Sequence, residues 1–228
     1  MTTHIGMLLY PRLTQLDLTG PFEVLHRIPN AEVHLLWKTL DPVTADSKLR
    51  LGPTTTLLAC PKLDVLFVPG GGGQMDLMED AVVLGFLREQ GRRARFVTSV
   101  CTGALLLGAA GLLNGYDATT HWGFMDLLPP LGARPVRRRV VIDRNRVTGG
   151  GVTAGIDFSL RLAALLAGET CAKEIQLGLE YDPEPPFESG HPDVAEPKIA
   201  ATVKARFAQR LEARAAQIAK ITSKGVPA

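Results

Sequence analysis

Three segments, each following an apolar run, carry the residues of this chain that could do chemistry. Cys101 ends the apolar run 96–100, and an Ala- and Leu-rich segment with the composition of a helix follows at once. A strand that turns sharply into a helix at Cys101 forms a nucleophile elbow, which holds the thiol at the edge of a sheet. The helix dipole and unpaired N–H groups would then lower the pKa of the thiol. A buried, inert cysteine is the alternative, and it is the interpretation we give to Cys60 and Cys171.

A carboxyl group follows the first apolar run. Asp17 stands between Leu16 and Leu18, just before a helix that Gly20–Pro21 is predicted to open. Apolar surroundings favour the protonated acid, so Asp17 could supply a proton or share one with a nearby thiolate. Helix capping explains an acid here equally well, although Thr19 is better placed for that role.

The third segment, 69–73, consists of one proline and four glycines after the apolar run 65–68. Backbone without side chains can approach a substrate closely and direct N–H groups at developing negative charge. A flexible turn is the plainer interpretation, and it is the favoured one for a glycine run taken alone.

A parallel sheet would bring these segments together, because ligands of open α/β sheets bind beyond the carboxyl ends of the strands. Short apolar runs bounded by Gly and Pro alternate with segments of helical period, which is typical of a sheet covered by helices. We predict an α/β fold, a flavodoxin-like or Rossmann-like sandwich with a mostly parallel central sheet, helices on both faces and a cysteine nucleophile elbow. The predicted central strands are 5–10, 33–37, 65–68 and 96–100. The other predicted elements are helices at 20–26, 75–90, 102–113, 152–166 and 199–221, and a hairpin around Arg144–Asn145.

Length and charge bound the class of protein. The 228 residues suit one large domain, which we place at 1–195, with 196–228 as a C-terminal helical extension of the same domain. Lys and Arg total 25 against 23 acidic residues, a formal charge of only +2, so nucleic acid is not an expected partner.

Cysteine usage and hydropathy bear on the compartment. The three cysteines are odd in number, and no CxxC pair suggests zinc or a disulfide framework. Charges or turn residues break every apolar run before about 18 residues, and no signal peptide is evident at the start. We therefore expect a soluble, cytoplasmic protein that does not enter a membrane.

Four motifs together resemble the DJ-1/PfpI superfamily, and within it the isonitrile hydratase branch. They are LDLTGP at 16–21, VTSVCTG at 97–103, ATTHW at 118–122 and TGGGVTAGID at 148–157. Two departures from the wider superfamily favour this branch. Thr102 stands where the peptidase-like members carry His after the nucleophile, and Asp17 stands where most members carry Glu.

The resemblance implies a cofactor-free enzyme, without metal, that hydrates isocyanides to N-substituted formamides through a thioimidate on Cys101. Asp17 would deliver the proton, and the Thr102 hydroxyl would support the geometry of the pair. Backbone N–H groups of Gly71 and Thr102 would form an oxyanion hole. The resemblance also implies a homodimer. His121, in the ATTHW motif, is interpreted as a structural residue, and a role for the glycine-rich stretch 149–151 is left open.

Two other functions stay open at this point. The same branch is similar to the sensor domains of AraC-type regulators, but only some 30 residues follow Pro197, too few for their helix-turn-helix domain of about 100 residues. A glyoxalase-like or deglycase-like activity on small aldehydes would use the same elbow, since only the substrate distinguishes it.

Overall fold

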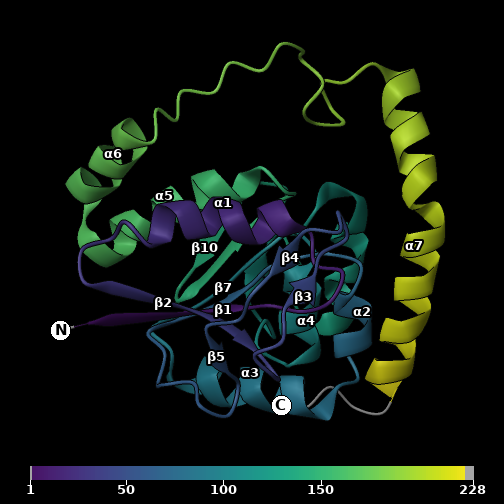
Figure 1. The fold of residues 1–228 in the computed structure, drawn as a ribbon. Helices are drawn as coiled ribbons and strands as arrows, with labels where there is room; N and C mark the ends of the chain where they lie inside the picture. The colour runs from purple at the N-terminus through teal and green to yellow at the C-terminus, as the bar shows by residue number, and fades with distance from the viewer. Residues whose placement is uncertain (1, 224–228) are drawn as a thin grey trace.

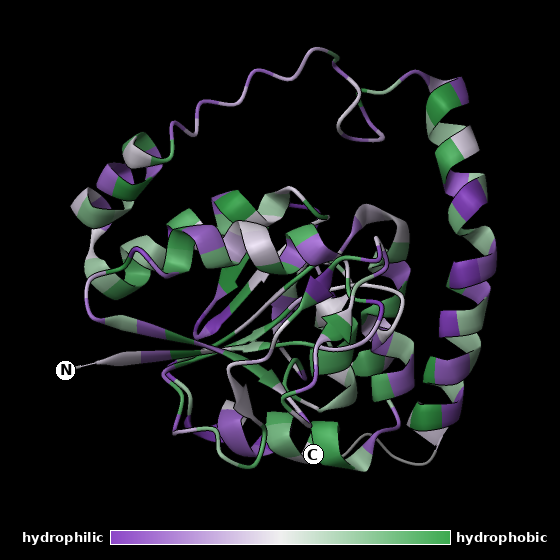
Figure 2. Ribbon diagram, viewed as in Figure 1, coloured by the Kyte–Doolittle hydropathy of each residue, from purple (hydrophilic) through white to green (hydrophobic). Residues whose placement is uncertain are grey.

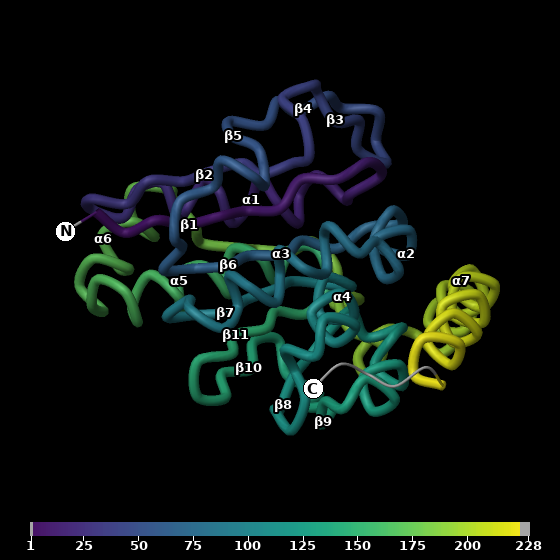
Figure 3. The backbone as a smooth tube through the Cα atoms, turned by 90° about the horizontal axis from the view of Figure 1, so that it is seen from below, coloured from purple at the N-terminus to yellow at the C-terminus, as the bar shows by residue number. Residues whose placement is uncertain are grey.

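A computed structural model describes residues 2–223. A seven-stranded sheet forms the centre of the molecule (Figure 1), and its strand order is β10-β11-β7-β6-β1-β2-β5 (Figure 3). Neighbouring strands are parallel except for the hairpin β10–β11, so the predicted mostly parallel sheet and the hairpin are confirmed. The strands are β1 (Thr3–Leu8), β2 (Ala31–Trp37), β5 (Thr55–Thr56), β6 (Val65–Val68), β7 (Phe96–Val100), β10 (Val140–Asp143) and β11 (Arg146–Gly149). Two small sheets pair β3 (Val43–Thr44) with β4 (Arg50–Leu51), and β8 (Asp117–Ala118) with β9 (Arg134–Pro135).

Helices cover both faces of the central sheet. On one face α1 (Gln15–Leu25) packs against α5 (Ala154–Ala167), which continues into α6 (Glu169–Gly178), while α3 (Ala81–Arg93) covers the other face (Figure 1). The short helices α2 (Gln74–Leu77) and α4 (Gly103–Ala109) contact each other. The 3-10 turns η1 (Trp122–Leu127) and η2 (Pro129–Leu131) complete the domain.

Three helix boundaries differ from the prediction. Helix α1 begins at Gln15, so Asp17 lies in its first turn and Pro21 lies inside the helix instead of near its start. The predicted helix 75–90 is two helices, because Asp80 accepts hydrogen bonds from the N–H groups of Val82 and Val83 and starts α3 anew. The predicted helix 102–113 ends at Ala109.

The C-terminal helix α7 (Pro197–Ser223) lies along the side of the domain, far from α6, in both views of the backbone (Figures 1 and 3). Its apolar and polar residues alternate around the helix (Figure 2), and Ile218 and Arg214 are the two that are buried. Phe207 packs edge-on against His121 and Trp122. The division at 195 stays a prediction, and the last five residues of the predicted extension, 224–228, lie outside the described residues.

Among the helices of residues 2–223, none combines the length and the apolar character that crossing a membrane requires.

Candidate active site

The elbow at Cys101 is present as predicted. The chain leaves β7 at Val100, and Cys101 takes a left-handed backbone conformation with φ +51° before α4 begins at Gly103. Its N–H group is held by the carbonyl oxygens of Gly149 and Gly150, at 3.1 and 2.7 Å. This conformation strains the backbone of a non-glycine residue, so the surrounding contacts must hold Cys101 in it. The side chain is only 7% exposed.

Gly70 allows the three predicted catalytic groups to meet. A Cβ atom at this position would lie 2.6 Å from Asp17 Oδ2, 2.7 Å from the Thr102 nitrogen and 2.8 Å from Cys101 Cβ. Only a residue without a side chain fits there, because real Cβ contacts are longer. The Gly70 N–H group also donates a hydrogen bond to Asp17 Oδ2 at 2.9 Å. Gly70 is therefore a packed, hydrogen-bonded part of the site, whereas Gly72 in the same run has open space around it.

Asp17 is fully buried, and burial raises the pKa of its carboxyl from 3.8 to about 7. Interaction with Cys101 and the Gly70 N–H group lowers this pKa, but by less than burial raises it. The Oδ1 atom has no hydrogen-bond partner among the described residues. The pKa is raised in the direction expected for an acid in apolar surroundings. The capping alternative is wrong, because α1 has Thr14 at its N-cap and the Thr19 hydroxyl donates to Gln15.

The thiol of Cys101 does not have the lowered pKa that we predicted from the helix start. Burial raises this pKa well above its usual value, and the Asp17 carboxyl raises it further. The N–H groups of Thr102 and Val152 interact with the sulfur and lower the pKa, but these two dipoles do not offset the loss of water. At neutral pH the carboxyl and the thiol together therefore hold at least one proton, which is available for transfer.

Thr102 connects the elbow to the glycine turn. Its Oγ1 atom accepts a hydrogen bond from the Gly71 N–H group at 3.1 Å, and Gly71 itself has φ +142°, which favours glycine. The hydroxyl thus connects the elbow to the turn that contains Gly70, and its role in supporting the geometry of the pair stays a prediction. Because Gly71 N–H already donates to Thr102 Oγ1, it could serve a substrate oxygen only after releasing this bond. The oxyanion hole of Gly71 and Thr102 stays a prediction.

Three further residues of the site were missed by the sequence analysis. Thr120 donates its hydroxyl to the Cys101 carbonyl at 2.7 Å, and the fully buried Tyr10 donates to the Pro69 carbonyl at 2.7 Å. Arg214 reaches in from α7, with Nε 3.2 Å from Gln74 Oε1 and its guanidinium 4.5 Å from the centre of the Phe124 ring. Of these three residues, only Thr120 lies in a motif that the sequence analysis singled out, ATTHW at 118–122. Nothing in the pattern of α7 distinguishes Arg214 from its exposed neighbours.

A cavity of about 800 Å³ lies next to the elbow. Thr120, Gly150 and Val152 line it, and each of these residues also contacts Cys101. His121 belongs to the same wall and packs against Trp122 and Phe207. Burial lowers the pKa of His121 to about 4, so the ring is neutral at pH 7. These contacts support its interpretation as a structural residue.

The fold and the elbow define the class of this protein. Residues 3–165 match the model of the DJ-1/PfpI family, and the chain belongs to that family. It is 56% identical to the isonitrile hydratase of Pseudomonas putida over 214 residues, which cover 94% of each chain.

Two other similarities bear on the alternatives. The structure is similar to that of a THiJ/PfpI family protein from Pseudomonas syringae, with a TM-score of 0.94 and 44% sequence identity over 96% of this chain and 91% of that one. The HTH-type transcriptional regulator GbdR of Pseudomonas aeruginosa is 33% identical over 168 residues, which are 69% of this chain but only 45% of the regulator.

Proposed function

We propose that this chain is an isonitrile hydratase, an enzyme that converts isocyanides to N-substituted formamides. One observation supports the chemistry above all others. The buried carboxyl of Asp17, with its pKa raised to about 7, lies beside the thiol of Cys101 on the elbow. The near full-length identity to the Pseudomonas putida enzyme supports the substrate class. The identity to that enzyme, 56% against 33% for the transcriptional regulator, favours an enzyme over a sensor domain.

The first step joins the thiol to the substrate. An isocyanide carbon accepts the sulfur of Cys101 as nucleophile and must gain a proton as the carbon–sulfur bond forms. That proton comes from the Asp17–Cys101 pair, so the thiol S–H is in effect added across the carbon. The product is a thioimidate, Cys101–S–CH=N–R, and no charge is created in the buried site. Asp17 is placed to pass the proton because its carboxyl is buried with the sulfur.

The second step releases the product. Water adds to the thioimidate carbon and one of its protons goes to the nitrogen, which leaves a tetrahedral intermediate. The carbon–sulfur bond then breaks, the sulfur regains its proton, and the carbon keeps the oxygen as HC(=O)NHR. We assign the Thr102 N–H group, and Gly71 N–H once it is released from Thr102, to the developing negative charge on that oxygen.

The proposal is tested by assaying formamide production from cyclohexyl isocyanide, with methylglyoxal as the competing substrate. Cys101→Ala abolishes formamide production, whereas Cys171→Ala, a half-buried cysteine on α6, retains it. Mass spectrometry of the native enzyme detects an adduct of one isocyanide on Cys101. Formamide production by Cys101→Ala, or turnover of methylglyoxal in place of the isocyanide, would contradict the assignment.

We further propose that the enzyme is a cytoplasmic homodimer. The three free cysteines fit a reducing compartment. Large apolar side chains that are exposed in the single chain, Leu177 at 83% and Phe187 at 77%, fit coverage by a second copy. Light scattering coupled to size-exclusion chromatography would measure the mass, and a monomer at micromolar concentration would refute the dimer.

A further inference from the structure

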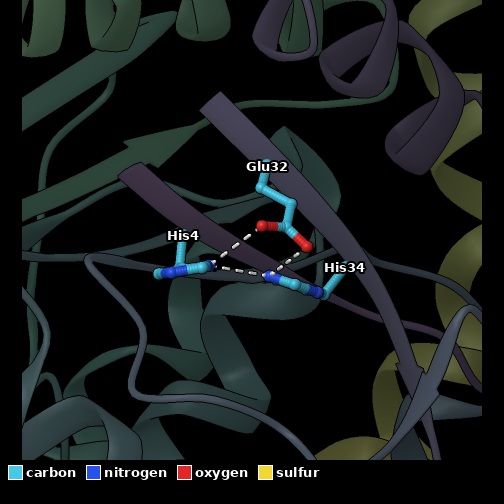
Figure 4. Close-up of side chains that lie close together, drawn as sticks. All are labelled: His4, Glu32 and His34. Atoms are coloured by element: carbon cyan, nitrogen blue, oxygen red, sulfur yellow. Dashed lines mark hydrogen bonds and ion pairs between the residues drawn. The ribbon is translucent and has the colours of Figure 1, made fainter. Parts of the chain in front are cut away.

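Three side chains with metal-binding atoms meet at the edge of the sheet opposite to the active site. His4 comes from β1, and Glu32 and His34 come from the neighbouring strand β2 (Figure 4). His4 and Glu32 are the second residues of their strands and His34 is at the middle of β2, whereas Cys101 and Asp17 follow the carboxyl ends of β7 and β1. We propose that His4, Glu32 and His34 form a binding site for a divalent transition-metal ion of the zinc type, separate from the catalytic centre.

Strand pairing explains why the three side chains share one face. His4 lies opposite Glu32 in the parallel register of β1 and β2, so the two side chains point to the same side of the sheet. His34 is two residues beyond Glu32 and therefore projects from the same face. Because two paired strands of the central sheet set the backbone at all three positions, only the side chains must be ordered when a metal binds.

The distances fit a tetrahedral ion. His4 Nδ1 lies 3.0 Å from His34 Nε2, while the two carboxylate oxygens of Glu32 lie 3.7 Å from His4 Nδ1 and 3.9 Å from His34 Nε2. Metal–ligand bonds of about 2.0–2.1 Å at tetrahedral angles place neighbouring ligand atoms about 3.3 Å apart. The three observed spacings lie on both sides of that value, so shifts of a few tenths of an ångström would accommodate the ion.

The donor set selects the class of metal. Two imidazoles with one carboxylate suit zinc, nickel or copper, while magnesium and calcium prefer sites made of oxygen ligands. The Glu32 side chain is 59% exposed and the His4 side chain 31%, so water can reach the site and occupy the fourth position. A hydrogen bond also fixes the His4 backbone, since its N–H group donates to Asp64 Oδ2 at 2.9 Å.

Without a metal, His4 Nδ1 and His34 Nε2 share a single hydrogen bond between stacked rings. An ion would replace the proton of that bond and would link β1 directly to β2. The proposed role is therefore structural, as a cross-link near the start of the chain, and the site would be filled or empty independently of the reaction at Cys101.

Calorimetric titration of the chelator-treated full-length chain with Zn²⁺ tests the site. We expect one saturable site per chain and a rise in the melting temperature with added Zn²⁺. His34→Ala abolishes this binding, and Glu32→Gln weakens it on the order of tenfold or more. The exposed Glu32→Gln variant keeps the test valid if His34→Ala does not fold. The matched control is His26→Ala, which removes a histidine beside Glu23 on α1 and leaves binding unchanged.

Binding of Co²⁺ distinguishes this site from the cysteines. A tetrahedral ion held by nitrogen and oxygen gives visible d–d absorption without a sulfur-to-metal charge-transfer band, and Cys101→Ala leaves that spectrum unchanged. The proposal is overturned if no saturable Zn²⁺ binding occurs, if Glu32→Gln binds Zn²⁺ as tightly as the native chain, or if the Co²⁺ spectrum carries a thiolate band.

Discussion

Replacing Asp17 by Asn tests whether burial raises the pKa of this carboxyl and thereby costs stability as the pH rises. The Asn side chain has nearly the same shape and can still accept the hydrogen bond from Gly70 N–H, but it cannot ionise. In the native chain burial raises the pKa of Asp17 from 3.8 to about 7. The folded state therefore binds a proton more tightly at Asp17 than the unfolded state does.

The sign and size of the effect follow from this shift. The stabilisation from the protonated carboxyl is fully present below pH 3.8 and is lost as the pH rises through about 7. A rise of about 3 pKa units corresponds to about 4 kcal/mol, at about 1.4 kcal/mol for each unit. The free energy of unfolding of Asp17→Asn should therefore increase relative to that of the native chain as the pH rises from 4 to 7. Above pH 7 the gain should level off at a few kcal/mol.

Urea denaturation followed by tryptophan fluorescence at several pH values measures this difference directly. All other titrating groups are common to the two proteins, so their contributions cancel in the comparison. The same pair of measurements in a Cys101→Ala background removes the coupling to the thiol. Parallel curves for the native chain and Asp17→Asn from pH 4 to pH 8 would refute the reasoning, because they would mean that Asp17 titrates alike in both states.

Three further predictions follow from the site. First, kcat/KM for an isocyanide should rise with pH through about 7, as Asp17 loses its extra proton and the pair reaches its single-proton form, and then stay level. Asp17→Asn should lose this rise, and an unchanged profile would assign it to another group. Second, Gly70→Ala should lower kcat/KM by about 100-fold or more, because its Cβ would displace the reacting groups, whereas Gly72→Ala, with open space around its Cβ, should behave as the native enzyme. Equal kinetics for the two variants would disprove the packing argument. Third, Arg214→Met should lower the free energy of unfolding by about 1–3 kcal/mol, because it leaves the buried Gln74 Oε1 without its donor, while the exposed Arg206→Met should change little. Similar urea midpoints for both would exclude a structural role for this cation.

Much of the fold could be predicted because local pattern and overall topology agree. The strand at 96–100, the abrupt start of a helix after Cys101 and the hairpin at Arg144–Asn145 each have a local signal in the sequence. The early start of α1 was missed because Gly20–Pro21 is a strong signal for a helix start, and packing against α5 overrides it. The break at Asp80 was missed because a cap inside a continuous apolar period has no clear sequence mark.

The chemistry of the site was harder to predict than its residues. Cys101 and Asp17 stand beside clear turn signals, but their pKa values depend on how much water the surrounding elements exclude. The sequence suggested a lowered thiol pKa from the helix start, and the burial of Cys101 reverses that direction. Arg214 was out of reach, because its contact with the glycine turn joins residues more than 140 positions apart.

The buried guanidinium of Arg214 has a consequence for which molecules the site can accept. With one proton shared, the Asp17–Cys101 pair carries a single negative charge, and Arg214 behind the glycine turn carries a single positive one. The charge of the pair and the charge of Arg214 sum to zero before a substrate binds. An uncharged molecule such as an isocyanide preserves this neutrality at every step, while an anion would bring an unmatched charge into a buried site. The site therefore favours uncharged substrates over anions, and the positive charge in this balance comes from α7, which is remote in sequence from Asp17 and Cys101.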